Sequence, residues 1–247
     1  ILLFSSPTHP GTSADDLLIG DSTVNVMMAG PGNDTLVGNG GADFLWAGEG
    51  NDVLQISDTT FVTIDGGSGD DTLELTGSGL SLDQTDMAGR TLREIETIDL
   101  AGSGANSLML DVVEVLSRSD ASNSLTVTGD SDDVLYVDPN WIYSSPVELG
   151  ETTFRRFTQG AAELFVDAEL RLGLKLSEVS DAWTISLDGT DLLFTDGTNS
   201  TRLPAEACPE ILLQGSDADD SVSIGPLSSG FSGSVTLNLG SGNDQVD

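Results

Sequence analysis

The chain has 247 residues, with 41 Asp or Glu against 8 Lys or Arg, and a formal net charge of -33. A surface of this charge repels polyphosphates, so we expect no nucleic-acid partner. Asp (29) outnumbers Glu (12) and equals Gly (29), a composition typical of tight turns and oxygen-ligated metal sites rather than helices. No uncharged apolar stretch of about 18 residues occurs, so no transmembrane segment is predicted.

Few residues in the sequence suit catalysis or covalent cross-linking. The chain starts at Ile1 without an initiator Met, and we expect it to be a piece of a longer protein. The only histidine is His9, which argues against a Ser-His-Asp triad, and the chain is predicted not to be an enzyme. The single Cys208 is interpreted as a small buried residue and cannot form a disulfide within the chain. Bound divalent cations would supply the missing cross-links.

Residues 11–55 consist of five consecutive nonapeptides. They read GTSADDLLI, GDSTVNVMM, AGPGNDTLV, GNGGADFLW and AGEGNDVLQ. The sixth position of each holds a carboxylate or amide, in order Asp16, Asn25, Asp34, Asp43 and Asp52. The eighth position is apolar each time, so each nonapeptide is predicted to form a glycine-rich turn followed by a short strand with one inward side chain.

Two nonapeptides make one 18-residue coil, so turns two repeats apart stack at roughly the 4.8 Å spacing of strands. Asp16, Asp34 and Asp52 then share one flank of the stack, and Asn25 and Asp43 share the other. Carboxylates stacked at this distance repel one another unless a hard cation lies between them. Ca²⁺, which takes 6 to 8 oxygen ligands, is the predicted cation.

AGPGNDTLV and AGEGNDVLQ resemble the G-G-x-G-x-D nonapeptide of the RTX calcium-binding repeat family. The resemblance implies a parallel β-roll that holds several structural Ca²⁺ ions through sixth-position Asp side chains and glycine carbonyls. Carried over to this chain, the ligands are the side chains of Asp16, Asp34, Asp43 and Asp52 and the backbone of Gly30, Gly32, Gly41, Gly48 and Gly50. Asn25 departs from the pattern, so the Asn25/Asp43 site is expected to be weaker.

Further copies of the motif follow the continuous block. GGSGDDTLE places Asp71 at the sixth position, 19 residues after Asp52, and we expect a bulge to absorb the extra residue. Looser copies place Asn106, Asp133, Asp220 and Asp244 at the same position. Asp71, Asp133, Asp220 and Asp244 are therefore further predicted calcium ligands.

The remaining sequence also indicates an all-β protein, a parallel β-roll or β-solenoid followed by further β-rich segments. Residues 164–176 alternate strictly between apolar and polar side chains, which predicts one long half-buried strand. Weak helical character is expected at 83–97 and 111–117, and Arg155 and Arg156 are interpreted as a solvated turn. The expected segments are a terminal segment (1–10), an RTX-type roll (11–82), a degenerate solenoid (83–140), a β-rich module (141–210) and a second repeat block (211–247).

Residues 94–170 also resemble, more loosely, modules of very large secreted RTX adhesins. This resemblance implies a non-catalytic, extracellular or cell-surface module that folds on calcium after secretion and serves as scaffold, stalk, filament or surface-layer component. The alternative is a calcium-dependent accessory region of a secreted hydrolase whose catalytic domain lies outside these residues. Other copies of the chain and cell-surface glycans are the further partners considered.

Overall fold

The computed structural model describes residues 8–83, 89–110, 115, 123–137, 141–175, 182–196, 200–205, 210–227, 231 and 233–247. Strands and turns make up almost all of these residues, which confirms the all-β prediction. Cys208 lies outside the described residues. Within the described ranges, no helix reaches the length and apolarity that a membrane crossing needs.

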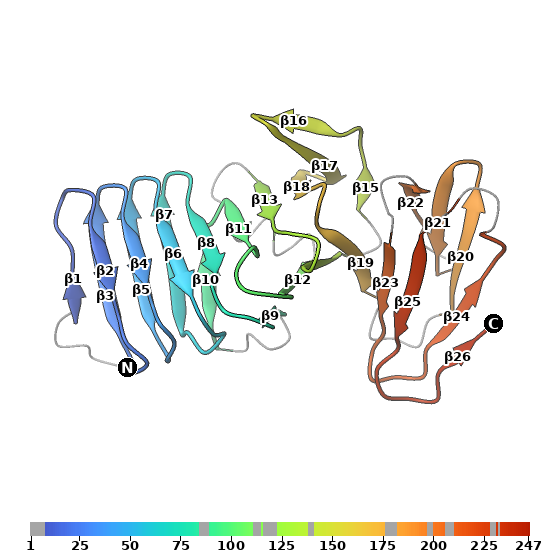
Figure 1. Cartoon of the computed structure of the whole chain (residues 1–247), viewed down its shortest axis with the longest axis horizontal. Coiled ribbons are helices and arrows are strands. Elements are labelled where there is room, and N and C mark those ends of the chain that lie inside the picture. The colour runs from blue at the N-terminus through green and yellow to red at the C-terminus, as the bar shows by residue number, and fades with distance from the viewer. Residues whose placement is uncertain are drawn as a thin grey trace.

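The N-terminal part is a roll of two parallel sheets that face each other (Figure 1). Sheet A contains β1 (His9–Pro10), β3 (Val26–Pro31), β5 (Phe44–Glu49), β7 (Thr63–Ser68) and β10 (Thr91–Arg93). Sheet B starts with β2 (Leu17–Ile19), β4 (Thr35–Val37), β6 (Val53–Ile56) and β8 (Thr72–Leu75). Because consecutive strands alternate between the sheets, each nonapeptide supplies one turn and one strand, and the predicted β-roll is confirmed.

The extra residue before Asp71 lies in a turn. Val37 pairs with Gln55 in sheet B, whereas Phe44 pairs with Thr63 in sheet A, so the spacing changes between these two pairs. Residues 57–62 connect β6 to β7 and contain the insertion, where we had expected a bulge. A turn absorbs an added residue without breaking the hydrogen bonds of a strand ladder.

Farther along the roll, sheet C takes the place of sheet A, while sheet B continues. Sheet B continues through β11 (Thr97–Asp99), β13 (Ser124–Thr128) and β18 (Ala162–Asp167). Sheet C begins with β9 (Ser81–Leu82) and continues through β12 (Ser107–Leu110), β14 (Val134–Val137), β19 (Arg171–Lys175), β23 (Glu210–Gln214) and β25 (Ser234–Asn238). Sheets B and C therefore face each other in the middle of the molecule, and the predicted five-segment division stays a prediction.

Two antiparallel insertions leave this parallel stack. Strands β15 (Ile142–Tyr143), β16 (Val147–Leu149) and β17 (Thr152–Gln159) extend sheet B beyond β18 and rise above the roll in Figure 1. Sheet D consists of β20 (Ala182–Asp188), β21 (Asp191–Thr195), β22 (Ser200–Pro204), β24 (Ser221–Ile224) and β26 (Gln245–Val246). Its strands β20, β24 and β26 pair in parallel, so sheets C and D complete the stack. Strands β21 and β22 pair in antiparallel at the edge of sheet D and are the second insertion.

The predicted long strand at 164–176 is wrong, because β18 ends at Asp167 and β19 begins at Arg171. The chain turns at residues 168–170 to pass from sheet B to sheet C, and the Glu169 N–H donates to Asp167 Oδ1 at 2.9 Å. The prediction of a solvated turn at Arg155 and Arg156 is also wrong, since both lie in β17. Arg155 is buried and donates to the carbonyls of Asp167 (2.7 Å) and Leu170, which fixes this corner.

The helical expectation fails at 91–93 and at 97, whereas Val115, the described residue of the expected segment 111–117, is helical. Residues 91–93 and 97–99 are the strands β10 and β11, which pair in parallel with β7 and β8. Pairing in a stacked sheet overrides the weak local preference for a helix. Residues 84–88, 111–114 and 116–117 lie outside the described residues.

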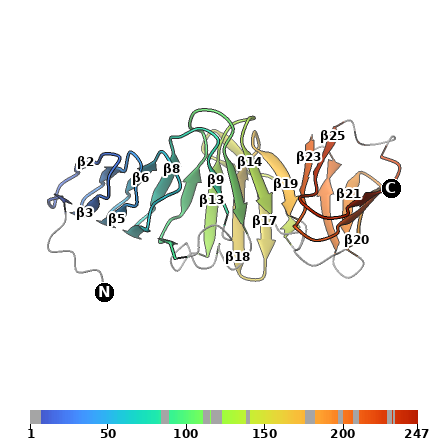
Figure 2. The same ribbon diagram turned by 90° about the horizontal axis from the view of Figure 1, so that it is seen from below.

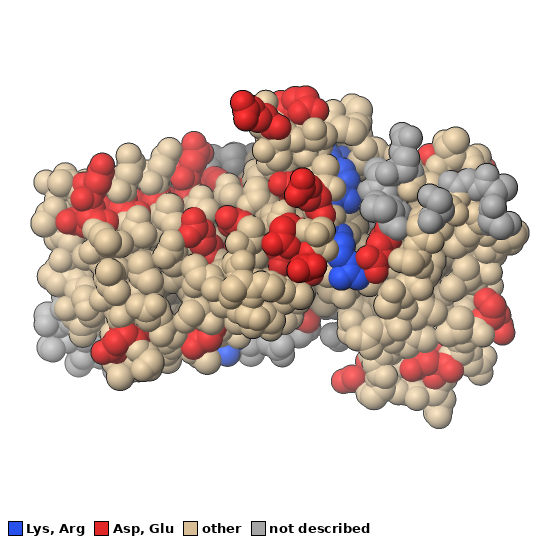
Figure 3. All heavy atoms as spheres, in the orientation of Figure 1, with Lys and Arg blue, Asp and Glu red and all other residues tan. Residues whose placement is uncertain are grey.

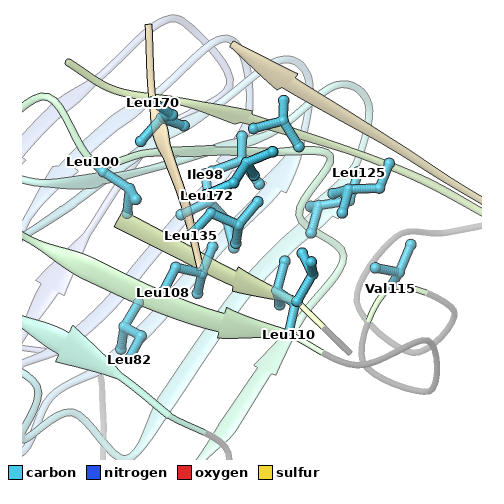
Figure 4. Close-up of a cluster of buried hydrophobic side chains, with 14 of the residues drawn as sticks. Leu82, Ile98, Leu100, Leu108, Leu110, Val115, Leu125, Leu135, Leu170 and Leu172 are labelled. Carbon is cyan, nitrogen blue, oxygen red and sulfur yellow. The ribbon is translucent and has the colours of Figure 1, made fainter. Parts of the chain in front are cut away.

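The core is one continuous file of apolar side chains between the facing sheets. Each coil contributes the residue at the centre of its strand, as in the paired series Leu36, Leu54, Leu73 and Ile98, all fully buried. Figure 4 shows the same arrangement in the middle of the molecule, where Ile98 and Leu125 of sheet B face Leu108, Leu135 and Leu172 of sheet C. The result is an elongated molecule with β2 near one end and the C-terminus near the other (Figure 2).

Leu54→Ala tests this core, because Leu54 is fully buried between coils. We expect a loss of about 2–5 kcal/mol in the free energy of unfolding, measured by urea denaturation in saturating calcium. Leu17→Ala, at a side chain that is 63% exposed, is the control and should change stability by less than about 0.5 kcal/mol. Equal effects of the two variants would contradict the described packing.

Candidate metal centre

One hydrogen bond recurs along the flank of the roll that leads into sheet B. The residue just before each strand donates its backbone N–H to the carboxylate of the equivalent residue one coil later. Asp16 donates to Asp34 Oδ1 (2.8 Å), Asp34 to Asp52 Oδ1 (2.7 Å) and Asp52 to Asp71 Oδ1 (2.8 Å). We call each of these contacts a rung, and the structure thus brings together four of the sequence-predicted ligands in one ladder.

The same contact precedes the strands of the other three sheets. Asn25 donates to Asp43 Oδ1 (2.8 Å) before sheet A, and Asn106 donates to Asp133 Oδ1 (2.8 Å) before sheet C. Asp220 donates to Asp244 Oδ1 (3.0 Å) before sheet D. All sixth-position residues predicted from the sequence therefore occupy rungs, but in four separate ladders.

The second side-chain contact separates two kinds of rung. We call a rung closed at a residue whose side chain accepts a backbone N–H of its own turn. Asp133 does so while it also accepts the Asn106 N–H, whereas Asp16, Asn25 and Asp220 are the N–H donors of their rungs. Asp16 Oδ2 accepts from Thr12 N (2.6 Å), and Asn25 Oδ1 accepts from Asp21 N (2.9 Å). Asp133 Oδ2 accepts from Asp130 N (3.0 Å), and Asp220 Oδ2 accepts from Ser216 N (2.9 Å).

The rungs of the regular repeats are open. Asp34, Asp52 and Asp71 are at most 1% exposed, and the buried Oδ2 of each has no hydrogen-bond partner among the described residues. Leaving a buried carboxylate oxygen without a partner is costly in a protein interior. Three such oxygens in one ladder therefore indicate a ligand that this flank is built to receive.

Backbone carbonyls of the glycines line the same turns. Gly48 has a φ of 130°, and a Cβ there would lie 2.0 Å from the Gly30 carbonyl oxygen. Gly50, with a φ of 131°, approaches the Gly32 carbonyl in the same way, at 1.9 Å. Only glycine allows these carbonyls to stack against the next coil. Gly41 also has a positive φ, and its N–H donates to Asp58 Oδ2 at 3.3 Å.

Burial raises the pKa of several of these carboxyl groups. The pKa of Asp71 rises to about 7 and that of Asp43 to about 6, chiefly because burial disfavours the ionised form. Burial raises the pKa of Asp52 and Asp133 as well. The rung hydrogen bond opposes each shift, whereas neighbouring carboxylates add to it.

Calcium fits this donor set. Ca²⁺ coordinates carboxylate and carbonyl oxygens, which are the groups that the open turns provide. No group of three Asp, Glu, His or Cys side chains converges on one point in the part of the chain that the structure describes. A calcium ion between two open rungs would therefore take two carboxylates and complete its shell with glycine carbonyls.

A stack of parallel coils with acidic, glycine-rich turns defines a calcium-binding β-roll. The family model of the RTX calcium-binding nonapeptide repeat matches residues 19–54 and 62–76 in 4 copies, about a fifth of the chain. These residues are thus RTX repeats, a structural calcium-binding module that typically occurs in secreted proteins. No curated protein and no solved structure matches the chain.

The structure adds residues that the sequence-based prediction missed. Glu96 Oε2 accepts the Asp71 N–H at 2.8 Å and so extends the sheet B ladder by one coil. The fifth repeat positions form a second ladder of opposite direction, in which Asn51 donates to Asn33 Oδ1 (2.8 Å) and Asp70 donates to Asn51 Oδ1 (3.0 Å). The recurrence of Asp or Asn at position five signals this outer ladder, whereas nothing in the sequence around Glu96 repeats the motif.

Gly48→Ala should destabilise the calcium-loaded roll by more than about 3 kcal/mol, because it combines a positive φ with a backbone clash. Gly79→Ala is the control, since Gly79 has a φ of 67° but nothing within 4 Å of the added Cβ. It should cost about 1 kcal/mol. Thermal unfolding of both variants in calcium measures the difference, and equal losses would show that the close carbonyl approach is unimportant.

The raised pKa values predict how pH affects the calcium-free protein. Asp71 has a pKa of about 7 in the folded chain and 3.8 as its ordinary value, so between these values the folded chain binds more protons. The contribution of this group to the free energy of unfolding is therefore fully present below pH 3.8 and is lost as the pH rises through 7.

Calorimetry in chelator should give a higher Tm at pH 5 than at pH 8. Saturating calcium should reverse the order, because the metal binds the ionised carboxylate. Asp71→Asn removes the titrating group and should narrow the difference measured in chelator. A calcium-free protein that is more stable at pH 8 would contradict the described burial.

Proposed function

We propose that this chain is a non-catalytic, calcium-dependent structural section of a larger extracellular protein, serving as a stalk or scaffold. The observation that carries the proposal is the file of open carboxylate oxygens on Asp34, Asp52 and Asp71. Calcium between them would be held by adjacent turns and would join each coil to the next.

The strongest sites are assigned to the open rungs, between Asp34 and Asp52 and between Asp52 and Asp71. Carbonyls of Gly30, Gly32, Gly48 and Gly50 supply the remaining oxygens of the first of these sites. The closed rungs at Asp16, Asn25, Asp133 and Asp220, together with Asp43, Asp244 and the backbone of Gly41, remain weaker candidates. A closed side chain must give up a hydrogen bond within its own turn before it can ligate a metal.

The excess of acidic side chains supports folding that is triggered by calcium after secretion. Residues 1–89 contain no Lys or Arg, and Figure 3 shows that acidic side chains are spread over the face in view while basic ones are few. Without calcium, stacked carboxylates in this region repel one another or take up protons. With millimolar calcium, the free energy of metal binding becomes free energy of folding.

The shape supports the role of a stalk. The parallel ladders of sheets A, B, C and D overlap along the molecule, and its two ends lie far apart (Figures 1 and 2). Such a stack transmits force through ladder hydrogen bonds along its length. Adhesion to glycans, filament formation and a surface-layer role are finer possibilities within the same proposal.

A calcium titration of the chelator-stripped chain tests this function. We expect a cooperative gain of β signal in circular dichroism and several bound ions by calorimetry. Asp34→Asn and Asp52→Asn keep an oxygen for the rung but remove a charge, so each should weaken calcium binding about tenfold or more.

Asp133→Asn is the matched control, because both oxygens of Asp133 already accept backbone hydrogen bonds. It should weaken calcium binding less than Asp34→Asn or Asp52→Asn does, because Asp133 belongs to a weaker candidate site. A stripped protein that is fully folded and binds no calcium would refute the proposal. An equal loss of affinity in Asp133→Asn would refute the distinction between open and closed rungs.

A further inference from the structure

The coil after the last RTX repeat has an unusual turn. Arg93 pairs with Asp65 and Thr97 with Thr72, so Glu94, Ile95 and Glu96 stand where the preceding coil has the six residues 66–71. A glycine-rich, calcium-type turn is thus replaced by Glu-Ile-Glu. The match to the RTX repeat family model ends at residue 76, before this turn.

The short turn places its oxygens against the preceding open rung. Glu94 has a φ of 50°, a left-handed conformation that a non-glycine residue adopts at a cost. Its carbonyl oxygen lies 1.9 Å from the position of a Cβ on Gly66, and Asp71 Oδ2 lies 2.6 Å from the same position. The Glu94 carbonyl and the unpartnered, fully buried Asp71 Oδ2 therefore converge beside Gly66.

Glu96 contacts the same residue, Asp71. Its Oε2 accepts the Asp71 N–H at 2.8 Å, so its carboxylate occupies the place that Asp holds in earlier coils. Glu96, Asp52 and Asp70 all act on Asp71 as like charges. The Arg93 guanidinium binds Asp65, at 2.5 and 3.1 Å.

We propose that Asp71, Glu96 and the Glu94 carbonyl form a terminal calcium site, which closes the RTX ladder one coil beyond the last repeat. This inference rests on the proposed calcium function and adds a site that the nonapeptide motif does not encode. The longer Glu side chain compensates for the shorter turn, since it reaches the rung from a backbone that lacks the glycine-rich loop. The site joins the regular repeats to the irregular solenoid that follows.

The test is the number and affinity of calcium ions bound by the full chain after chelator treatment, measured by equilibrium dialysis and calorimetry with Ca²⁺ alone. Glu96→Gln keeps an oxygen to accept the Asp71 N–H but removes the charge. We expect it to bind one ion fewer than the unmodified chain. Glu96→Asp keeps the charge on a shorter side chain and should weaken the same ion about tenfold.

Asp70→Asn is the matched control, because it removes one charge next to Asp71 in the preceding turn and restores the Asn found at positions 33 and 51. It should bind as many ions as the unmodified chain. Circular dichroism in saturating calcium verifies that each variant is folded.

The outcomes separate the two proposals. If the unmodified chain binds several ions and both Glu96 variants bind them unchanged, the terminal site is refuted and the calcium function stands. If the unmodified chain binds no calcium, both proposals fail. Loss of an ion in Asp70→Asn as well as Glu96→Gln would show a general charge effect and would also refute the terminal site.

Discussion

The recurring hydrogen bond from a residue just before a strand to a side-chain oxygen one coil later is the contact on which the rest of this structure depends. It spans 18 residues in the regular repeats, 19 at Asp71, 25 at Glu96, 27 at Asp133 and 24 at Asp244. The contact therefore fixes the register of the stack while the length of the coil varies. It also explains the acidic residues at the turns that lead into sheet B, where Asp34, Asp52, Asp71 and Glu96 accept the N–H of the preceding coil.

The rung uses one side-chain oxygen, and the second oxygen decides the chemistry of the turn. A turn that folds back on its own Asp, as at Asp133, satisfies that oxygen with a backbone N–H. In the glycine-rich turns, by contrast, the buried Oδ2 of Asp34, Asp52 or Asp71 has no hydrogen-bond partner among the described residues. Glycine thus shapes these turns, because positive φ values bring glycine carbonyls against the next coil.

Replacement of one sheet at a time lets this architecture include segments that are not repeats. Sheet A ends at β10 after sheet C has begun at β9, and sheet D takes over where sheet B ends. The antiparallel strands β15–β17 are inserted between β14 and β18 without interrupting either parallel ladder. The buried Arg155 stabilises the corner between β18 and β19 by donating hydrogen bonds to the carbonyls of Asp167 and Leu170.

The sequence by itself determined the all-β class, the coil of the first repeats and the residues that form their rungs. A period of nine residues fixes which side chains stack. Only the tertiary structure decided which carboxylates are open, because that depends on the path of each turn and not on the identity of its Asp. Glu96 and the corner at 168–170 were likewise beyond reach, since their partners lie at irregular separations along the chain. Local patterns carry information over one coil, whereas contacts between coils of unequal length are set by the packing of the whole stack.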